Sequence, residues 1–316
     1  MSGHFTPGNR WFAYGNLAAA MVIVGSSVVV GKIMVTQLPV FLASALRFAI
    51  ALAVLVPLMY LREGHALPRL SGRNWRILGL QSLFGSFLFT TFLLYGLGST
   101  SPAAAGIITS TTPAWIGLIA WLAMGERPLR RGVAGIACAL CGVLLINLAA
   151  PAADGPGSGA VSLAGNLLVI AAVICESLFL LMRKGVDQPL SALAASTAIS
   201  AFGFAWFLPA GIVQAVGFDF AAIGPAAWFS VLYYGLVVTI VAYLCWFAGI
   251  MQVDAATAGV FTGLMPVSAV ALSMLVLEEP LTLPKAVGCG LALAGIMLIS
   301  FARRSVQHAS CFETNR

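Results

Sequence analysis

The most constraining feature of this sequence is a stretch of 42 residues that occurs twice, 153 positions apart. Ala105–Ile146 aligns without a gap with Ala258–Ile299, and twelve of the 42 paired positions are identical. The identities include residues that composition bias does not readily align: Thr109, Pro113, Glu126, Gly135 and Gly142 with Thr262, Pro266, Glu279, Gly288 and Gly295. The same displacement pairs Trp75 with Trp228. The chain is therefore interpreted as an internal duplication.

The composition indicates a membrane protein. Hydrophobic residues make up 60% of the chain, charged residues only 8%, and the mean hydropathy is +1.01. Soluble domains carry roughly 25% charged residues, and a span of about 20 apolar residues crosses a bilayer. The apolar runs predict an all-α membrane protein with ten transmembrane helices: residues 11–30, 40–61, 77–97, 102–124, 133–149, 163–182, 190–213, 228–250, 255–277 and 284–302.

One stretch rich in proline and glycine, Ala150–Gly159, falls where the duplication requires the two halves to join. The predicted organisation is a five-helix repeat at 11–149, a linker at 150–161, a second five-helix repeat at 162–302 and a cytoplasmic tail at 303–316. No regular structure is expected for the polar tail.

The distribution of basic residues predicts the orientation. If the N-terminus is cytoplasmic, the segments on that side hold 13 Lys and Arg, and the outer loops hold only Lys32 and Lys285. This asymmetry follows the positive-inside rule, which also accounts for the net charge of +6 without a nucleic-acid partner. Both termini are then cytoplasmic. Because each half has an odd number of spans, the halves are inverted-topology repeats.

Inverted repeats are typical of secondary transporters that work by alternating access, with a substrate site at the midplane between the halves. Interrupted helices at corresponding positions indicate that site, and Pro113 and Pro266 are such a pair. They are predicted to act in gating, although each could also only kink a packed helix. The hydroxyls of 109–112 either line the cavity or bond the carbonyl that Pro113 leaves free.

With these features, the chain resembles the drug/metabolite transporter superfamily, EamA type, and is most similar to YddG-type aromatic amino-acid exporters. The family's pattern of small residues and a downstream lysine is similar to Gly25-Ser26-Ser27 with Lys32, and its second copy to Glu176-Ser177 with Lys184. The resemblance implies a bacterial inner-membrane protein. It also implies that spans one to four and six to nine surround a central cavity, with spans five and ten outside it as supports.

Two charged residues within the spans are the first candidates for binding, because charge is costly in a membrane. Arg47 suits a substrate carboxylate through its rigid fork of donors, or it snorkels or binds helix-end carbonyls. Glu176 suits a substrate ammonium or a proton, or it makes a structural hydrogen bond. A direct ion pair between the two is a third interpretation.

The predicted cavity lining adds polar and aromatic residues from spans three, four and eight: Gln81, Tyr95, Trp115, Tyr243 and Trp246. Tyr243 and Trp246 are three positions apart, so they share a helix face that suits an aromatic substrate. An interfacial aromatic belt is the alternative, and it is an open interpretation for Tyr233 and Tyr234 near the outer end of span eight.

No sequence signature indicates an enzyme or a cofactor. HExxH, GxxxxGK[ST] and G-x-S-x-G are absent from the sequence, and the three histidines lie outside the apolar spans. The preferred function is export of amino acids, aromatic ones first, by a secondary transporter whose partners are the substrate and the bilayer. The alternatives are efflux of cationic drugs or other metabolites, and an intramembrane enzyme or scaffold. The oligomeric state stays open, a monomer included.

Overall fold

The computed structural model describes residues 10–65, 70–125, 130–153, 159–182, 185–188, 190–250, 252–253, 258 and 260–313. Within these residues the chain forms helices and short connections and contains no strand. Several elements of the sequence interpretation lie outside the described residues: Glu126-Arg127-Pro128, residues 154–158 of the linker, Arg183-Lys184 and Gly259.

The first half of the chain forms eight helical elements: α1 (Arg10–Val35), α2 (Val40–Glu63), α3 (Gly72–Ser82), η1 (Leu83–Leu88), α4 (Phe89–Ser99), α5 (Pro102–Thr109), α6 (Thr112–Met124) and α7 (Arg130–Ala153). The second half contributes α8 (Gly159–Met182), α9 (Ala192–Ala215), η3 (Phe220–Ala222), α10 (Pro225–Leu232), η4 (Tyr233–Val241), α11 (Ala242–Ile250), α13 (Leu264–Leu277) and α14 (Leu283–Glu313). Within the described chain, seven helical runs are long and apolar enough to cross a membrane, or eight if the bent pair α5 and α6 is one span.

Both halves interrupt an α-helical run with a π-helix. The elements α3, η1 and α4 form one continuous run, and α10, η4 and α11 form another. The displacement of 153 residues that relates the two halves carries Leu83–Leu88 onto 236–241, which is part of η4. A π-helix is rare and is commonly found at functional sites. The sequence predicts each of these runs as an uninterrupted span.

Several helices are longer than the apolar runs suggested. Lys32 lies in the last turn of α1 and not in a loop. The helices α7 and α8 extend to Ala153 and from Gly159, into the segment assigned to the linker. The expectation of an irregular tail is wrong up to Glu313, where α14 ends. The tail contains neither proline nor glycine after Arg303, so no residue type that breaks helices stops α14.

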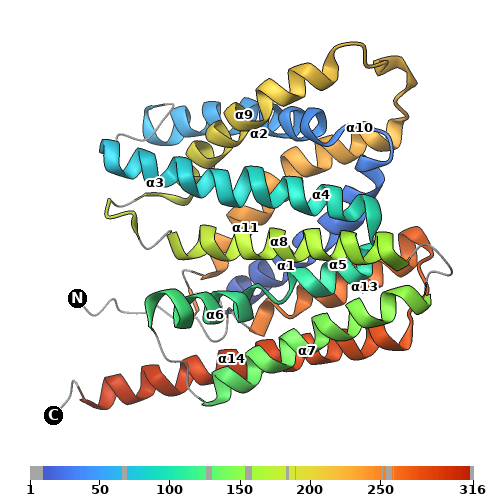
Figure 1. The fold of residues 1–316 in the computed structure, drawn as a ribbon. Coiled ribbons are helices and arrows are strands. Elements are labelled where there is room, and N and C mark those ends of the chain that lie inside the picture. The colour runs from blue at the N-terminus through green and yellow to red at the C-terminus, as the bar shows by residue number, and fades with distance from the viewer. Residues whose placement is uncertain are drawn as a thin grey trace.

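The helices pack side by side as a bundle, with α7 and α14 together at one edge (Figure 1). Glycines that repeat between the halves allow these two helices to touch. A methyl group at Gly135 would lie 2.8 Å from the carbonyl oxygen of Gly295, and one at Gly142 would lie 3.0 Å from that of Gly288. Alanine at either position would therefore push the two backbones apart.

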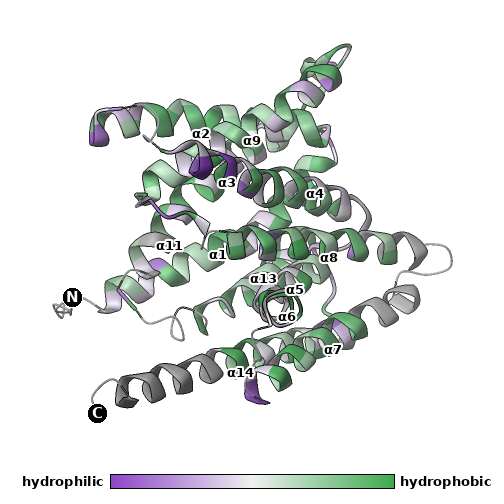
Figure 2. Cartoon of the chain, turned by 60° about the vertical axis from the view of Figure 1, so that its left-hand side comes forward, coloured by the Kyte–Doolittle hydropathy of each residue, from purple (hydrophilic) through white to green (hydrophobic). Residues whose placement is uncertain are grey.

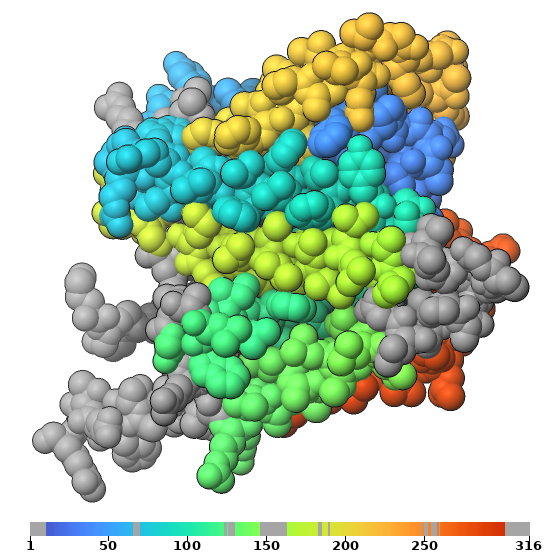
Figure 3. Space-filling view, in the orientation of Figure 1, coloured from blue at the N-terminus to red at the C-terminus, as the bar shows by residue number. Residues whose placement is uncertain are grey.

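The remaining helices form the body of the molecule. On the face shown in Figure 3, α9, α3 with α4, α8, and α6 with α7 lie side by side. Apolar residues cover most of the length of these helices, and strongly hydrophilic residues gather at places such as the start of α3 (Figure 2). The main apolar core joins residues of both halves, among them Val28, Leu94, Val173 and Val231.

The bundle has two ends, which we name by the chain segments found there. The terminal end holds the start of α1, the end of α14 and the connection between α8 and α9 (Figure 1). The far end holds the connections between α4 and α5 and between α13 and α14. Each end carries a polar cluster that links the two halves of the chain, and a third polar cluster lies between them.

Candidate functional site

The central cluster is built around Arg47 on α2, whose side chain is only 8% exposed. Its Nη2 donates a hydrogen bond to Thr90 Oγ1 at 2.9 Å, and its Nε has no hydrogen-bond partner. The guanidinium carbon lies 4.4 Å from the ring centre of Phe48 and 5.3 Å from that of Tyr234. In the part of the chain that the structure describes, no carboxylate forms an ion pair with it. Arg47 is thus a buried cation held by a hydroxyl and two rings.

The two π-helices flank Arg47 from opposite halves. Thr90 follows η1 by two residues, and Tyr234 is the second residue of η4. Gly235 lets η4 approach α2 closely, because a methyl group there would lie 3.0 Å from the carbonyl oxygen of Arg47. In addition, Thr239 Oγ1 donates to the carbonyl of Tyr234 at 2.8 Å, five residues back, a spacing that fits the wider turn.

Tyr234 joins η4 to α1 and does not lie in an interfacial belt. Its ring is buried, and its hydroxyl donates to the carbonyl of Ser27 at 2.5 Å. The neighbouring Tyr233 pairs its hydroxyl with that of Ser26, also at 2.5 Å. The interfacial interpretation is therefore wrong for Tyr234. The position of Tyr234 in its span did not reveal that the ring is buried, because the residue that its hydroxyl contacts, Ser27, lies 207 residues away in the sequence.

Glu176 approaches the same region from α8. It is nine residues from the exposed Leu167, and at about 100° per residue the two side chains point to opposite sides of the helix. Glu176 therefore faces the interior, yet it retains accessible surface, unlike the fully buried Ser177 beside it. Its carboxyl Oε2 lies 2.6 Å from Thr112 Oγ1 at the start of α6.

Pro113 and Pro266 each follow a break in a helix. The axes of α5 and α6 are bent by 41° at Ser110-Thr111, immediately before Pro113. In the second half, residues 262–263 separate the preceding helical turn from α13, which contains Pro266. Tight backbone hydrogen bonds mark both breaks, from Thr111 N to Ile108 O at 3.1 Å and from Gly263 N to Val260 O at 3.1 Å.

Tyr243 and Trp246 lie half-buried on α11. The phenol of Tyr243 is close enough to interact electrostatically with both Arg47 and Glu176. It therefore belongs to the central cluster, which we define as Arg47, Thr90, Thr112, Glu176, Tyr234 and Tyr243. Trp246 is one helical turn further along and shares the face of Tyr243.

The other predicted lining residues are distributed differently. Gln81 is fully buried and its Nε2 donates to the carbonyl of Phe179 at 3.0 Å, which ties α3 to α8, while its Oε1 has no partner. Trp115 packs against the main core with its indole nitrogen buried and unpartnered. Tyr95 is 43% exposed and contacts the edge of Phe41, so the structure does not bring it to the central cluster.

The far-end cluster ties the halves together with largely buried charges. Lys32 Nζ donates to the carbonyls of Leu97 at 2.5 Å and Thr100 at 3.1 Å, which lie at and just beyond the end of α4. Glu279 accepts from the backbone N–H of Ala103 at 3.2 Å and pairs with Lys285. The side chains of Lys285 and Glu279 are only 16% and 12% exposed. A further hydrogen bond of 2.5 Å joins the side chains of Thr100 and Asn166.

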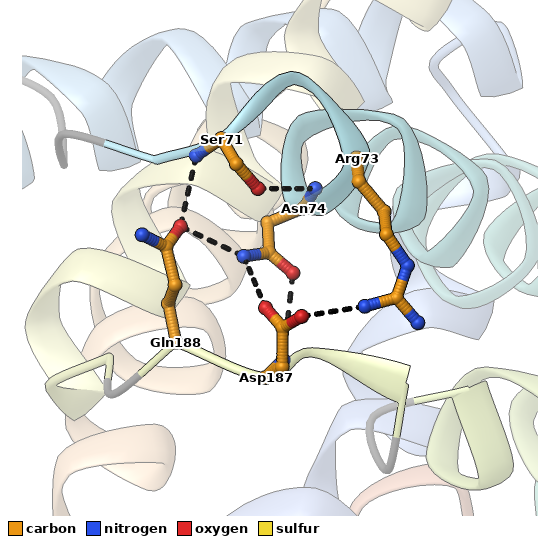
Figure 4. Close-up of polar contacts among 5 residues, drawn as sticks. All are labelled: Ser71, Arg73, Asn74, Asp187 and Gln188. Carbon is orange, nitrogen blue, oxygen red and sulfur yellow. Dashed lines mark hydrogen bonds and ion pairs between the residues drawn. The ribbon is translucent and has the colours of Figure 1, made fainter.

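The terminal-end cluster links α3 to the connection after α8 (Figure 4). Arg73 pairs with Asp187 at 2.6 Å, and both side chains are 60% exposed. The buried Asn74 donates to Asp187 Oδ1 and to Gln188 Oε1, each at 2.7 Å. Gln188 also accepts from the backbone of Ser71 at 2.8 Å. The hydrogen bond from Asn74, and after it the charge of Arg73, lower the pKa of Asp187.

Comparison with known proteins gives the context of these clusters. Residues 11–148 and 163–301 each match the model of the EamA-like transporter family. The "Uncharacterized transporter YetK" of Bacillus subtilis (strain 168) is 45% identical over 287 residues, 90% of this chain and 86% of the relative. The "Probable terminal-alkyne amino-acid exporter" of Streptantibioticus cattleyicolor is 24% identical over 72% of this chain and 74% of its own length.

The fold also has a match among solved structures. A chain known by crystallography is 22% identical and superimposes with a TM-score of 0.63, over 92% of this chain and 98% of its own. At this level of identity the likeness concerns the fold alone.

Proposed function

The chain belongs to the EamA-like transporter family, and from this premise we propose that it is a secondary transporter that exports amino acids, aromatic ones in particular. The named relatives are transporters, and an enzymatic role finds no support among them. Export of an amino acid is supported by the name of one relative and by the charges of the central cluster. The preference for aromatic substrates, as in the YddG-type exporters that the sequence resembles, rests on Tyr243 and Trp246.

The proposed architecture has ten spans in two inverted five-helix repeats, at 11–149 and 162–302, with the linker 150–161 between them and the tail 303–316 after them. Two separate family matches support it. So do the helix breaks before Pro113 and Pro266 and the π-helices at corresponding positions. We assign the terminal end to the cytoplasm of a bacterial inner membrane, because the basic residues gather in its segments. The protein is proposed to work as a monomer.

One observation carries the choice of substrate: a buried guanidinium, with no carboxylate partner among the residues that the structure describes, shares a cluster with an inward-facing glutamate. A buried cation that lacks an anion is unfavourable, and an incoming carboxylate would relieve it. In the proposed complex Arg47 binds the substrate carboxylate and Glu176 faces the ammonium, with Tyr243 between them. An amino acid supplies both charges in one molecule. A cationic drug would supply only one, and Arg47 would repel it.

The proposed site continues along α11 and into the neighbouring helices. Tyr243 and Trp246 give flat apolar surface for an aromatic side chain, which gains both burial and ring contact. Gln81 and Trp115 complete the proposed lining, since each keeps a buried polar atom without a partner. Tyr95 faces away and is not included. Pro113 and Pro266 mark the two points at which we expect the helices to bend as access alternates.

The test is counterflow of radiolabelled phenylalanine in proteoliposomes, with unlabelled amino acids and the cationic dye ethidium as competitors. The wild-type chain should exchange phenylalanine, and alanine should compete less well than tryptophan. Arg47→Gln should lower exchange by roughly 10- to 150-fold, since a hydrogen bond to a charged group contributes about 1.5–3 kcal/mol. Arg76→Gln, which removes an exposed arginine from α3, is the matched control and should leave exchange unchanged.

Each alternative predicts a distinct result. Competition by ethidium alone would replace the amino acid with a cationic substrate. Unchanged exchange in the Arg47→Gln variant would remove the carboxylate site. A chain that folds in the liposome but exchanges none of these compounds would contradict amino-acid export altogether.

A further inference from the structure

The hydroxyl of Thr112 lies between two oxygen atoms, each of which could accept its proton. Its Oγ1 is 2.6 Å from Glu176 Oε2 and 2.8 Å from the carbonyl oxygen of Thr109. A hydroxyl has one proton to donate and two lone pairs that accept, whereas a carbonyl and an ionised carboxylate only accept. If Glu176 were ionised, the two contacts would have only one proton to share.

Pro113 decides which of the two contacts receives the hydroxyl proton. In an α-helix the carbonyl of Thr109 would accept from the N–H of residue 113, but proline has no N–H. Among the described residues, the Thr112 hydroxyl is the donor that reaches this carbonyl. An unsatisfied carbonyl inside a membrane is costly, so we infer that the hydroxyl proton stays on the Thr109 side.

Each short contact has a proton of its own only if Glu176 is protonated. The carboxyl O–H then donates to Thr112 Oγ1, and the Thr112 hydroxyl donates to the Thr109 carbonyl. The neighbouring Ser177 does not compete, because its hydroxyl bonds the carbonyl of Val173 at 2.8 Å on its own helix. The proton count thus connects the state of Glu176 to the break between α5 and α6.

The charged and titratable groups around Glu176 do not supply an alternative counter-charge. The helices that pack against α8 are α3, α4, α5, α6 and α7, together with η1. Within the described chain, none of them places a charged side chain within ion-pair distance of Glu176. Among the described residues of other elements, the phenol of Tyr243 on α11 lies near enough to interact electrostatically with Glu176, and it interacts in the same way with the guanidinium of Arg47 on α2.

We propose that Glu176 is a proton-binding site and that the transporter exchanges its substrate for a proton. The inference rests on the proposed function and adds the coupling ion to it. When α5 and α6 change their bend, Thr112 moves from between the two oxygens and the carboxyl loses its acceptor. The carboxyl O–H bond then breaks, its electron pair stays on Glu176, and the proton passes to water at the open end. The carboxylate that remains can hold a substrate ammonium.

A single carboxylate holds either a proton or an ammonium, and this exclusivity makes the exchange obligatory. A zwitterion that enters from one side displaces the proton, and a proton from the other side displaces the zwitterion. The structure corresponds to the protonated, substrate-free member of this cycle.

Infrared spectroscopy tests the proton site without any substrate. The wild-type protein in liposomes at pH 7 should show the carbonyl band of a protonated carboxyl group, and Glu176→Gln should abolish it. Thr112→Val should move the band to higher frequency, because the carboxyl loses its acceptor, and Thr112→Ser should restore it. Melting temperatures in detergent exclude variants that are misfolded. The absence of a protonated carboxyl band that depends on Glu176 would overturn the proposal.

Transport tests the coupling and separates it from the identity of the substrate. For one proton per substrate, a pH difference imposed at zero membrane potential should change the accumulation ratio of phenylalanine by about tenfold per pH unit. Glu176→Gln should make the ratio independent of pH. If wild-type exchange occurs but ignores the pH difference, proton coupling fails and amino-acid export stands. If phenylalanine is not exchanged at all, the proposed substrate fails, and the infrared result alone decides whether Glu176 binds a proton.

Discussion

The far-end cluster and the terminal-end cluster both join the first half of the chain to the second, but their charged side chains differ in exposure to solvent. At the far end, the ion pair of Glu279 and Lys285 is largely buried, at 12% and 16% exposure. At the terminal end, the pair of Arg73 and Asp187 is 60% exposed on each side. The two clusters therefore have similar chemistry and unequal energies.

The difference indicates which end separates more readily. Charges in the far-end cluster have already lost their water, so removing one partner leaves the other desolvated, at a cost of about 3–5 kcal/mol when burial is complete. An exposed pair is replaced by water contacts when it parts and contributes about 0–1 kcal/mol. At the far end, the bond that Glu279 makes across the halves, to the N–H of Ala103, involves such a desolvated charge. We therefore expect this bond to hold the halves together more strongly than the exposed pair of Arg73 and Asp187 does.

The largest expected effect comes from Glu279→Gln. This change removes the charge partner of Lys285 and weakens the bond to Ala103 N at the start of α5. The bond to Ala103 N crosses the halves, and loss of a hydrogen bond to a charged group, about 1.5–3 kcal/mol, would shift the ratio of closed to open far ends by roughly 10- to 150-fold. Spin labels at the exposed positions 98 and 281 should report a longer distance across the far end. Glu278→Gln removes one negative charge at the adjacent, exposed residue and should leave the distance between the spin labels unchanged. Equal distances in the two variants would contradict the dominance of the far end.

A smaller effect is expected from Asn74→Ala at the terminal end. The amide of Asn74 is buried and bonds both Asp187 and Gln188, so it is the one desolvated link there. Its loss should lower stability by about 1–3 kcal/mol, which a shift of the melting temperature in detergent measures. Asn16→Ala removes an amide that bonds only its own helix, and should cost less. A larger shift for Asn16→Ala would mean that the terminal-end cluster does not hold α3 in place.

A third effect depends on pH. Hydrogen bonding from Asn74 and the charge of Arg73 lower the pKa of Asp187 in the folded state. A lowered folded pKa gives stability that is present above the unfolded value of about 3.9 and lost as pH falls through the folded pKa. The terminal-end cluster should therefore be unaffected between pH 5 and pH 8 in round terms and weaken only in acid, below about pH 4. Melting curves of Asp187→Asn should show a shallower decline in acid than those of wild type. The same decline in both would remove Asp187 as its source.

The smallest effect is expected from Arg73→Gln. The pair with Asp187 is exposed, so its loss should change stability by about 0–1 kcal/mol at low salt. At 1 M salt, where charges are screened over about 3 Å, the difference from wild type should vanish. Arg76→Gln on the same helix has no ion pair among the described residues and controls for net charge. A salt-independent loss for Arg73→Gln would show that the guanidinium contributes through packing.

The sequence predicted the helices well where a single physical rule decides them. Long apolar runs predicted the membrane helices, and the paired prolines predicted interruptions in α5 with α6 and before α13. The cost of charge in an apolar interior singled out Arg47 as a candidate binding residue, and the structure buries it beside aromatic rings. These features depend on local composition and on the duplication, both of which can be read from the chain itself.

The sequence did not predict how the site is assembled, because its contacts connect distant segments. Arg47 and Thr90 are 43 residues apart, and Thr112 and Glu176 are 64 apart. Gln81 was expected to be internal, but its amide binds a backbone carbonyl, and sequence alone does not distinguish that partner from a substrate. Tyr95 is exposed because a helix of apolar and aromatic residues can turn such a ring to lipid as readily as to the core.

The paired π-helices have a mechanical meaning for the site that they flank. A π-turn closes its hydrogen bond over five residues and so stores one residue more than an α-turn. Returning that residue to α-helical geometry would swing everything beyond it by about 100°, the angle of one helical step. On one side this rotation would carry Thr90 away from Arg47, and on the other it would withdraw the ring of Tyr234. Each half thus contains one extra residue in a π-turn. If one half lost its π-turn while the other kept its own, the two helices would rotate relative to each other by one helical step.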